Sequence, residues 1–335
     1  MTEEYSHVFH RIITLLVVIP GLFFLFAIAV EFYETSILFL ILAGFFILYI
    51  AFLLPKLDNR INKSPIQYPE PGHEGLKSRQ YRDIITFLAI TVLTFVVMHL
   101  CVLLMHEFSH SFFAYAIGQK QDPFNIIYGN WIGAHWDENV DYSRLFSAGL
   151  GPTAAAIAFA GPLSNIVLFF VTAGFLFSKT VKKHRWIYHC IFWTLIITFV
   201  MIFEYVFTRS FIPHDDFGNI NHGLLITPWP IFIVGTCLGL LGLYYILGKK
   251  IPEYYAIVTP HNRSNQYLTI GAVSFVIFLF YIGVSLLSYP EIPRWWCGLA
   301  GIVALFIVPF LASPSRRWVQ IAIKKQSPDN QTKPD

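Results

Sequence analysis

Long apolar runs separated by short polar segments dominate the chain, and most charged residues fall between the runs. A bilayer core of about 30 Å requires roughly 20 apolar residues per helix. On hydropathy, eight runs are long enough to cross it. These runs fall at 12–30, 36–54, 84–105, 148–177, 187–209, 229–248, 267–288 and 295–313. The pattern predicts an all-α, polytopic membrane protein with about eight transmembrane helices.

Composition supports this class and excludes others. Of the 335 residues, 56% are hydrophobic and only 13% are charged, whereas a soluble domain carries about 25% charged residues. A water-soluble fold of this length cannot bury so much apolar surface, so a soluble enzyme, a disordered chain and a disulfide-stapled module are excluded. The net charge of +3 is too small to indicate nucleic acid as a partner.

The runs divide the chain into five segments. We expect an N-terminal two-helix hairpin, a proline-containing cytoplasmic linker, a core, a C-terminal set of helices and a cytoplasmic tail. Their expected bounds are 1–55, 56–83, 84–228, 229–313 and 314–335. Within the core, the weakly alternating segment 119–147 predicts a short β or re-entrant structure.

The positions of the basic residues predict the orientation. Of the 23 Lys and Arg residues, only Lys120, Arg144, Arg209 and Arg294 fall in the loops that alternate with those on the N-terminal side. Cytoplasmic loops carry the excess of Lys and Arg. Both termini are therefore predicted to be cytoplasmic, and the end of the third run lies toward the extracytoplasmic face.

The third run continues into an H-E-x-x-H motif formed by His106, Glu107 and His110. Residues i and i+4 share one face of a helix, so the two imidazoles can bind one metal ion. Glu107 lies beside such an ion, where it can take a proton from a metal-activated water. Alternatively, the helix ends at the membrane interface and these groups are only solvated. The aromatic continuation, Phe112 and Phe113, favours burial, and ionisable groups at membrane depth are usually functional.

A catalytic zinc site needs a third protein ligand and an open position. The segment 210–220, after the fifth run, offers His214, Asp215 and Asp216 on the same side of the membrane as the motif. An ordinary polar turn is the alternative, because Pro, Asp and Asn are common in turns. The residues alone leave the choice of third ligand open.

Small residues and two Gly-Pro pairs mark the fourth run. Gly151-Pro152 opens it, and Gly161-Pro162 interrupts it shortly before Asn165. Small residues let helices approach closely, and a proline frees backbone groups that can line a cavity. Tight helix packing without a further function explains the same pattern.

Taken in order, three motifs resemble those of the site-2 protease family of intramembrane zinc metalloproteases. They are H-E-x-x-H at 106–110, A-G-P-L-S-N at 160–165, and Pro213 followed by two aspartates. The resemblance covers roughly 84–225, three of the eight runs. It implies a three-helix metalloprotease core that holds one zinc ion per chain.

Residue roles follow from this resemblance. It implies that His106, His110 and Asp216 bind zinc, with Asp215 as the alternative third ligand. It implies that Glu107 is the catalytic base.

The resemblance also implies that Asn165, with Gly161 and Pro162, binds an extended substrate beside the zinc. Two features depart from the family pattern. Phe217 stands where the family has Gly, and no Asn precedes Pro213 at the family's spacing.

The sequence therefore predicts a zinc-dependent endopeptidase that cuts transmembrane or membrane-associated proteins in the lipid bilayer. One alternative is a protease-like protein that binds or carries membrane proteins without cutting them. Another is a membrane diiron oxidase, which needs further paired histidines. The twelve His residues supply no H-x-x-H-H pair.

Three further residues attract attention. His135 lies in the 119–147 segment and belongs either beside the site or on a surface loop. Glu204 is an intramembrane carboxylate, which is either functional or paired with Arg209. His99 lies two helical turns before His106, and we expect it to pack or to support the site rather than to bind metal.

Overall fold

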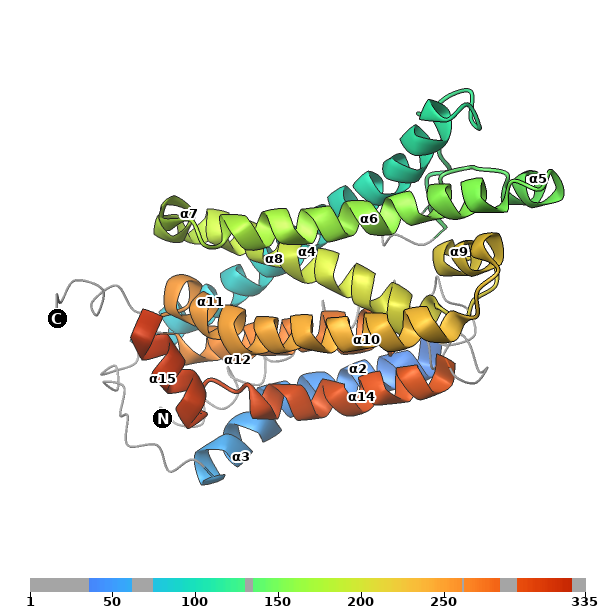
Figure 1. The fold of residues 1–335 in the computed structure, drawn as a ribbon. Helices are drawn as coiled ribbons and strands as arrows, with labels where there is room; N and C mark the ends of the chain where they lie inside the picture. The colour runs from blue at the N-terminus through green and yellow to red at the C-terminus, as the bar shows by residue number, and fades with distance from the viewer. Residues whose placement is uncertain (1–35, 62–74, 130–134, 261, 284–293, 327–335) are drawn as a thin grey trace.

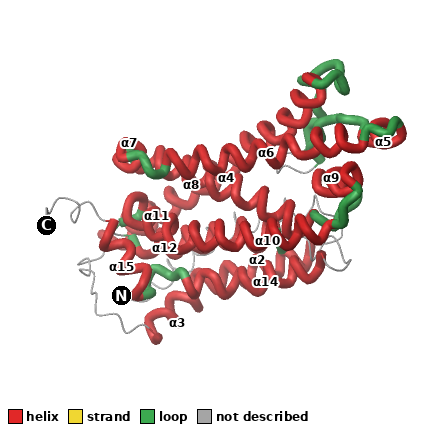
Figure 2. Tube along the Cα trace, in the orientation of Figure 1, coloured by secondary structure: helices red, strands yellow, loops and turns green. Residues whose placement is uncertain are grey.

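The computed structural model describes residues 36–61, 75–129, 135–260, 262–283 and 294–326. In these ranges every regular element is a helix and no strand occurs (Figure 2). The all-α prediction is confirmed for this part of the chain. The run at 12–30 lies outside the described residues.

Five helices in the described ranges are long and apolar enough to cross a membrane. They are Arg82–Ala116, Gly151–Phe175, Arg185–Arg209, Pro228–Val258 and Arg263–Tyr281. The predicted spans at 36–54 and 295–313 correspond to shorter apolar helices, Ile41–Leu57 and Trp295–Leu311. The predicted count of eight spans is therefore not confirmed.

Three long helices and one short helix form the part of the fold that carries the motifs (Figure 1). They are α4 (Gly75–Ala116), α6 (Gly151–Phe175), α8 (Arg185–Glu204) and α9 (Asp216–Leu224). α4, α6 and α8 pack against one another, and α9 packs mainly on α6. The C-terminal part of α4 is thereby brought close to the middle of α6, where Gly161 and Asn165 meet His106.

α4 differs from the prediction at both of its ends. The sequence placed a linker up to 83, but helix begins at Gly75. It also placed the end of the span at 105, but helix continues to Ala116 because the apolar run extends beyond the H-E-x-x-H motif. The motif therefore lies within a continuous helix, not at its frayed end.

The remaining helices surround this group (Figure 1). They are α2 (Ser36–Leu48), η1 (Tyr49–Leu53), α3 (Leu54–Ile61), α5 (Tyr142–Ser147), α7 (Lys179–Lys183), η2 (Tyr205–Arg209), α10 (Pro228–Tyr245), η3 (Ile246–Lys250), α11 (Ile251–Val258), α12 (Arg263–Ser274), η4 (Phe275–Tyr281), α14 (Arg294–Leu311) and α15 (Arg317–Gln326). Those labelled η are π-helical turns.

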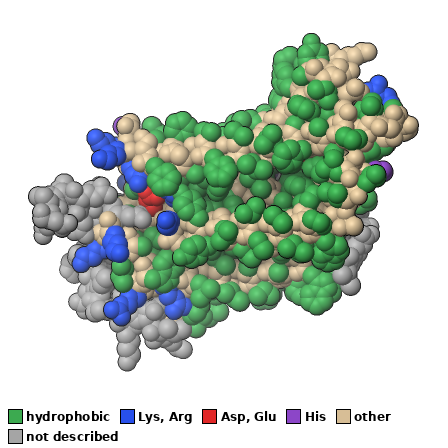
Figure 3. All heavy atoms as spheres, in the orientation of Figure 1, with side chains coloured by type: hydrophobic (Ala, Val, Ile, Leu, Met, Phe, Trp, Pro, Cys, Tyr) green, Lys and Arg blue, Asp and Glu red, His purple; other side chains and the backbone are tan. Residues whose placement is uncertain are grey.

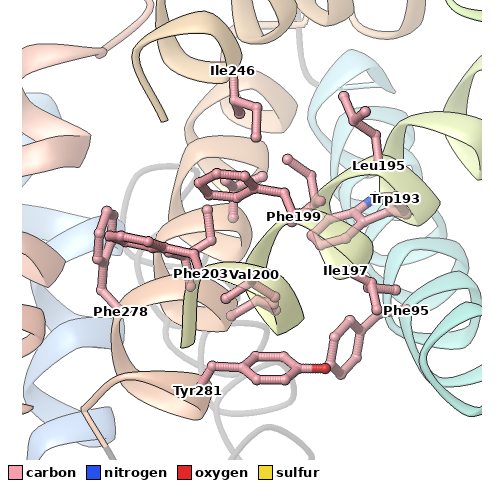
Figure 4. Close-up of a cluster of buried hydrophobic side chains, with 14 of the residues drawn as sticks. Phe95, Trp193, Leu195, Ile197, Phe199, Val200, Phe203, Ile246, Phe278 and Tyr281 are labelled. Atoms are coloured by element: carbon pink, nitrogen blue, oxygen red, sulfur yellow. The ribbon is translucent and has the colours of Figure 1, made fainter. Parts of the chain in front are cut away.

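The hydrophobic core is centred on α8, which contacts α4, α6, α10, α11 and η4. Figure 4 shows Trp193, Phe199 and Phe203 of this helix among buried side chains from its neighbours, including Phe95 and Phe278. By contrast, no residue of α10 is buried. α8 is thus an interior helix, and α10 covers it from outside.

The segment 119–147 contains no described strand. One antiparallel bridge joins Ile127 and Asp137, with backbone hydrogen bonds of 2.8 and 3.1 Å. Residues 130–134 lie outside the described ranges, and α5 follows the bridge. In its described parts the predicted β or re-entrant segment is a loop held by a single bridge.

Charge is distributed unevenly between the two ends of the molecule. Figure 3 shows most described Lys and Arg side chains at the end where α7, α11 and α15 lie. α5 and α9 lie at the opposite end (Figure 1). The motif-bearing end of α4 is therefore remote from the basic end.

Candidate metal centre

Two imidazoles of α4 point at one another from adjacent turns. His106 and His110 are four residues apart, so they share a helix face. Their Nε2 atoms lie 3.1 Å apart, and both side chains are buried. Two neutral imidazoles in this arrangement present two lone pairs to one point.

The third donor is Asp216, the first residue of α9. Its Oδ2 lies 3.0 Å from His106 Nε2, and its Oδ1 lies 3.4 Å from His110 Nε2. Asp215, the alternative third ligand, instead pairs with Arg209. The structure therefore brings Asp216, not Asp215, to the two imidazoles, and these three residues form a group able to hold a metal ion.

The spacing of the donor atoms fits a small divalent cation. Ligand bonds of about 2.0 Å to a tetrahedral zinc ion place ligand atoms roughly 3.3 Å apart. The three distances within the group are 3.0, 3.1 and 3.4 Å. Two imidazoles and one carboxylate also leave a coordination position open, as a catalytic site requires.

Backbone and amide groups orient the two imidazoles. His110 Nδ1 donates to the carbonyl oxygen of Ile157 on α6, at 2.7 Å. This fixes the proton on Nδ1 and leaves the Nε2 lone pair facing the group, the usual arrangement of a metal-binding histidine. The α4 motif thus depends on a carbonyl 47 residues away in the chain.

Asn165 lies directly against His106. Its side-chain amide is 3.0 Å from His106 Nδ1, and its Oδ1 atom is buried without a hydrogen-bond partner. Rotating the amide by a half turn exchanges its nitrogen and oxygen. The oxygen then accepts the Nδ1 proton and frees Nε2 for a metal, so the orphaned oxygen fits a metal-bound state.

Gly161 provides the space for the two rings. A Cβ at this position would lie 2.1 Å from His110 Nε2 and 2.7 Å from His106 Nε2. Any side chain here would displace the imidazoles. The neighbouring Pro162 is accommodated within α6, which continues to Phe175.

Electrostatics favour an ionised carboxylate at Asp216. Burial disfavours its charged form, but the close approach of the two imidazoles outweighs this. The pKa of Asp216 is consequently held below its usual value. Glu107 is also buried and lies within electrostatic reach of His110 and Asp216, so a second carboxylate adjoins the group.

Two residues near the group were not identified from the sequence. The Tyr205 hydroxyl lies 3.4 Å from His106 Nε2. Glu138, in the loop before α5, is buried and interacts electrostatically with His106, Glu107 and His110. Glu138 could have been noticed in the sequence, because it is a carboxylate in an otherwise aromatic loop. Nothing in the sequence distinguished Tyr205 from the other aromatic residues.

Other predicted residues lie outside the group. His99 packs in the core, where its ring stacks on Phe95 and its Nδ1 lies 2.6 Å from the Tyr281 hydroxyl. His135 is exposed on its loop. Glu204 pairs with Arg209, which confirms the pairing interpretation of this intramembrane carboxylate.

Comparison with protein-family models, with curated proteins and with solved structures found no match. The resemblance to site-2 proteases therefore remains a prediction from three short motifs. The chemistry of the site has to be argued from its own geometry.

Proposed function

We propose that this chain is a metal-dependent intramembrane endopeptidase. The observation that carries the proposal is the convergence of His106, His110 and Asp216 at one buried point; Glu107, the next residue after His106, is buried too and lies within electrostatic reach of His110 and Asp216. Two imidazoles, one carboxylate and an adjacent glutamate are the side chains that zinc peptidases of the H-E-x-x-H type use. Solvation of a helix end does not account for this convergence, because all three side chains are buried.

Each residue has a definite role in the proposed reaction. His106, His110 and Asp216 would hold a zinc ion, which supplies Lewis-acid polarisation of a substrate carbonyl and activation of water. Glu107 takes a proton from the attacking water and transfers it to the leaving amine. Asn165 and the Ile157 carbonyl keep the imidazoles in the required tautomer.

The bilayer restricts the substrate. A transmembrane helix keeps its carbonyl groups within its own hydrogen-bond ladder, so it must unwind locally before water can attack. Helices weakened by Gly or Pro are therefore the expected substrates. The site lies away from the basic end of the molecule (Figures 1 and 3), which supports cleavage toward the extracytoplasmic side.

The same donor set also suits mononuclear ferrous iron. Glu107 favours hydrolysis, because a buried base beside the metal has a direct use in activating water. A diiron oxidase needs more donors than the three that converge in the described part of the chain.

Metal analysis tests the proposal first. The detergent-purified chain is expected to contain about one zinc ion, retained in Glu107→Gln and lost in His106→Ala and Asp216→Ala. The matched control is Asp122→Ala, a change in an exposed loop. Absence of metal from the wild type, or iron in its place, would overturn the zinc centre.

Proteolysis is tested in liposomes with a single-span test protein whose helix contains a Gly-Pro pair. We expect the wild type to cut it and Glu107→Gln to leave it intact while retaining zinc. Equal cleavage by the two proteins would reject Glu107 as the base, and no cleavage by zinc-loaded wild type in a panel of such substrates would favour a non-catalytic binder.

A further inference from the structure

A partly buried ion-pair network links the end of α8 to the beginning of α9. Arg209 Nε lies 2.6 Å from Glu204 Oε1, and Arg209 Nη1 lies 3.1 Å from Asp215 Oδ2. The Glu204 side chain is 5% exposed. The guanidinium thus bridges two carboxylates that belong to different helices.

A π-helical turn makes the first of these pairs available. Tyr205–Arg209 is π-helical, so its backbone bonds join residues five apart. This spacing stacks Arg209 over Glu204, five residues earlier, whereas α-helical spacing favours pairs three or four apart. Such turns occur frequently at functional sites. The same turn carries Tyr205, whose ring lies 4.6 Å from the Arg209 guanidinium and whose hydroxyl reaches His106.

The second pair acts on the first residue of α9. Asp215 is the N-cap of this helix, and its Oδ1 accepts a hydrogen bond from the Asp216 backbone N–H at 3.0 Å. Its other oxygen is the one held by Arg209. One carboxylate therefore ties the guanidinium to the residue that faces the two imidazoles.

The loop 210–215, which joins η2 to α9, is also held by packing against α9. A Cβ at Gly218 would lie 1.9 Å from the Ile212 carbonyl oxygen, so the loop lies directly on α9. The Asn221 side chain donates to the Ser210 carbonyl at 2.9 Å. With these contacts in place, the ion pair leaves Asp216 little freedom to move.

We infer that Glu204, Arg209 and Asp215 form a positioning clamp that sets Asp216 against His106 and His110. The clamp explains why two adjacent aspartates have different roles, since Asp215 holds the guanidinium while Asp216 faces the imidazoles. A partly exposed ion pair contributes little to stability by itself, because solvent screens the attraction and the burial of Glu204 costs desolvation. Its value here is geometric, and the inference rests on the metal centre proposed above.

Zinc affinity of the full-length, detergent-purified protein tests the clamp. Asp215→Asn preserves a good N-cap but removes the charge that Arg209 holds. The matched control is Asp141→Asn, because Asp141 is likewise a helix N-cap, accepting a hydrogen bond from the Arg144 N–H of α5 at 2.9 Å. Zinc binding is measured by competition with a chromophoric chelator, after stripping the metal.

We expect Asp215→Asn to bind zinc about ten- to a hundredfold more weakly, as for other residues that orient metal ligands. Asp141→Asn should bind as the wild type does. The visible spectrum of the Co²⁺-loaded protein gives a second readout, since it reports ligand geometry at saturating metal. A changed spectrum in Asp215→Asn but not in Asp141→Asn indicates displaced Asp216, which a loss of overall stability would not produce.

Wild-type affinity and spectrum in Asp215→Asn would overturn the clamp while leaving the metal centre intact. If this variant does not remain monodisperse, Glu204→Gln tests the clamp instead, because it removes the carboxylate charge that pairs with Arg209 and leaves the α9 cap unaltered. Wild-type behaviour of Glu204→Gln would then overturn the clamp. Failure of the wild type to bind either metal would instead overturn the metal centre itself.

Discussion

Single residues around the metal centre are constrained by space as much as by chemistry. Gly161 is the tightest case, because both imidazoles occupy the volume that a side chain would need. We predict that Gly161→Ala loses metal while retaining most of its helix content. Elemental analysis checks this, with Gly174→Ala of the same helix as the control, since a Cβ there meets nothing within 4 Å. Metal retained in Gly161→Ala would show that the rings adopt other positions when metal is bound.

Asn165 permits a second prediction about a single residue. Its contact with His106 orients that ring, so Asn165→Ala should weaken zinc binding by about tenfold to a hundredfold. Chelator competition measures the change. Thr172→Val is the control, because Thr172 bonds only to carbonyls of its own helix. A role of Asn165 in substrate binding alone predicts normal zinc affinity and a reduced rate of cleavage.

At the level of single residues, the sequence predicted the three residues of the candidate metal centre. The pair His106 and His110 followed from the helical period, and Asp216 followed from a motif resemblance. The spacing did not exclude Asp215 as the third ligand, because Asp215 and Asp216 are adjacent and differ only in the direction of their side chains. That direction depends on Arg209, whose position is set by the π-helical turn.

The packing of α9 on α6 decides whether Asp216 reaches His106 and His110. α9 lies tightly against α6 at Gly223, where a Cβ would lie 2.3 Å from the Gly151 carbonyl oxygen. We predict that Gly223→Ala pushes α9 outward, lowers the free energy of unfolding by about 1–3 kcal/mol, and weakens zinc binding. The opening Gly-Pro pair of the fourth run thus serves close helix packing.

Thermal unfolding with and without zinc measures the effect. Gly44→Ala is the control, because a Cβ there meets nothing within 4 Å and alanine favours a helix over glycine. Loss of stability without loss of zinc affinity would show that α9 adjusts its position independently of Asp216.

Helix type was predictable from the sequence, but helix ends were not. The third run was expected to end at 105, although helix continues to Ala116. The polar residues of the H-E-x-x-H motif ended the run on hydropathy, but apolar residues resume after it and the helix continues through them. This extension matters because it places His106, Glu107 and His110 within one rigid helix.

The arrangement of the whole molecule separates the basic end from the metal centre (Figures 1 and 3). If the basic end is cytoplasmic, Lys183 on α7 and Asp122 in the loop after α4 face opposite sides of the membrane. We predict that, in a cysteine-free background, Asp122→Cys reacts with a membrane-impermeant thiol reagent added outside intact cells. Lys183→Cys should react only after permeabilisation. The reverse pattern would invert the topology and place the metal centre on the cytoplasmic side.

The sequence by itself determined the helical class of the protein and the first half of its candidate metal centre. A long apolar run that enters a bilayer can pair its own backbone groups only as a helix. A spacing of four residues on that helix then puts two imidazoles together. Both are local properties of the chain, which explains why they can be recognised without knowledge of the fold.

Tertiary structure decided the rest. Asp216 lies 110 residues from His106, and the Ile157 carbonyl lies 47 residues from His110. Contacts over such separations depend on how α6, α8 and α9 pack, and on the space left by Gly161. No local pattern specifies them, because they arise only when distant helices meet in the folded core.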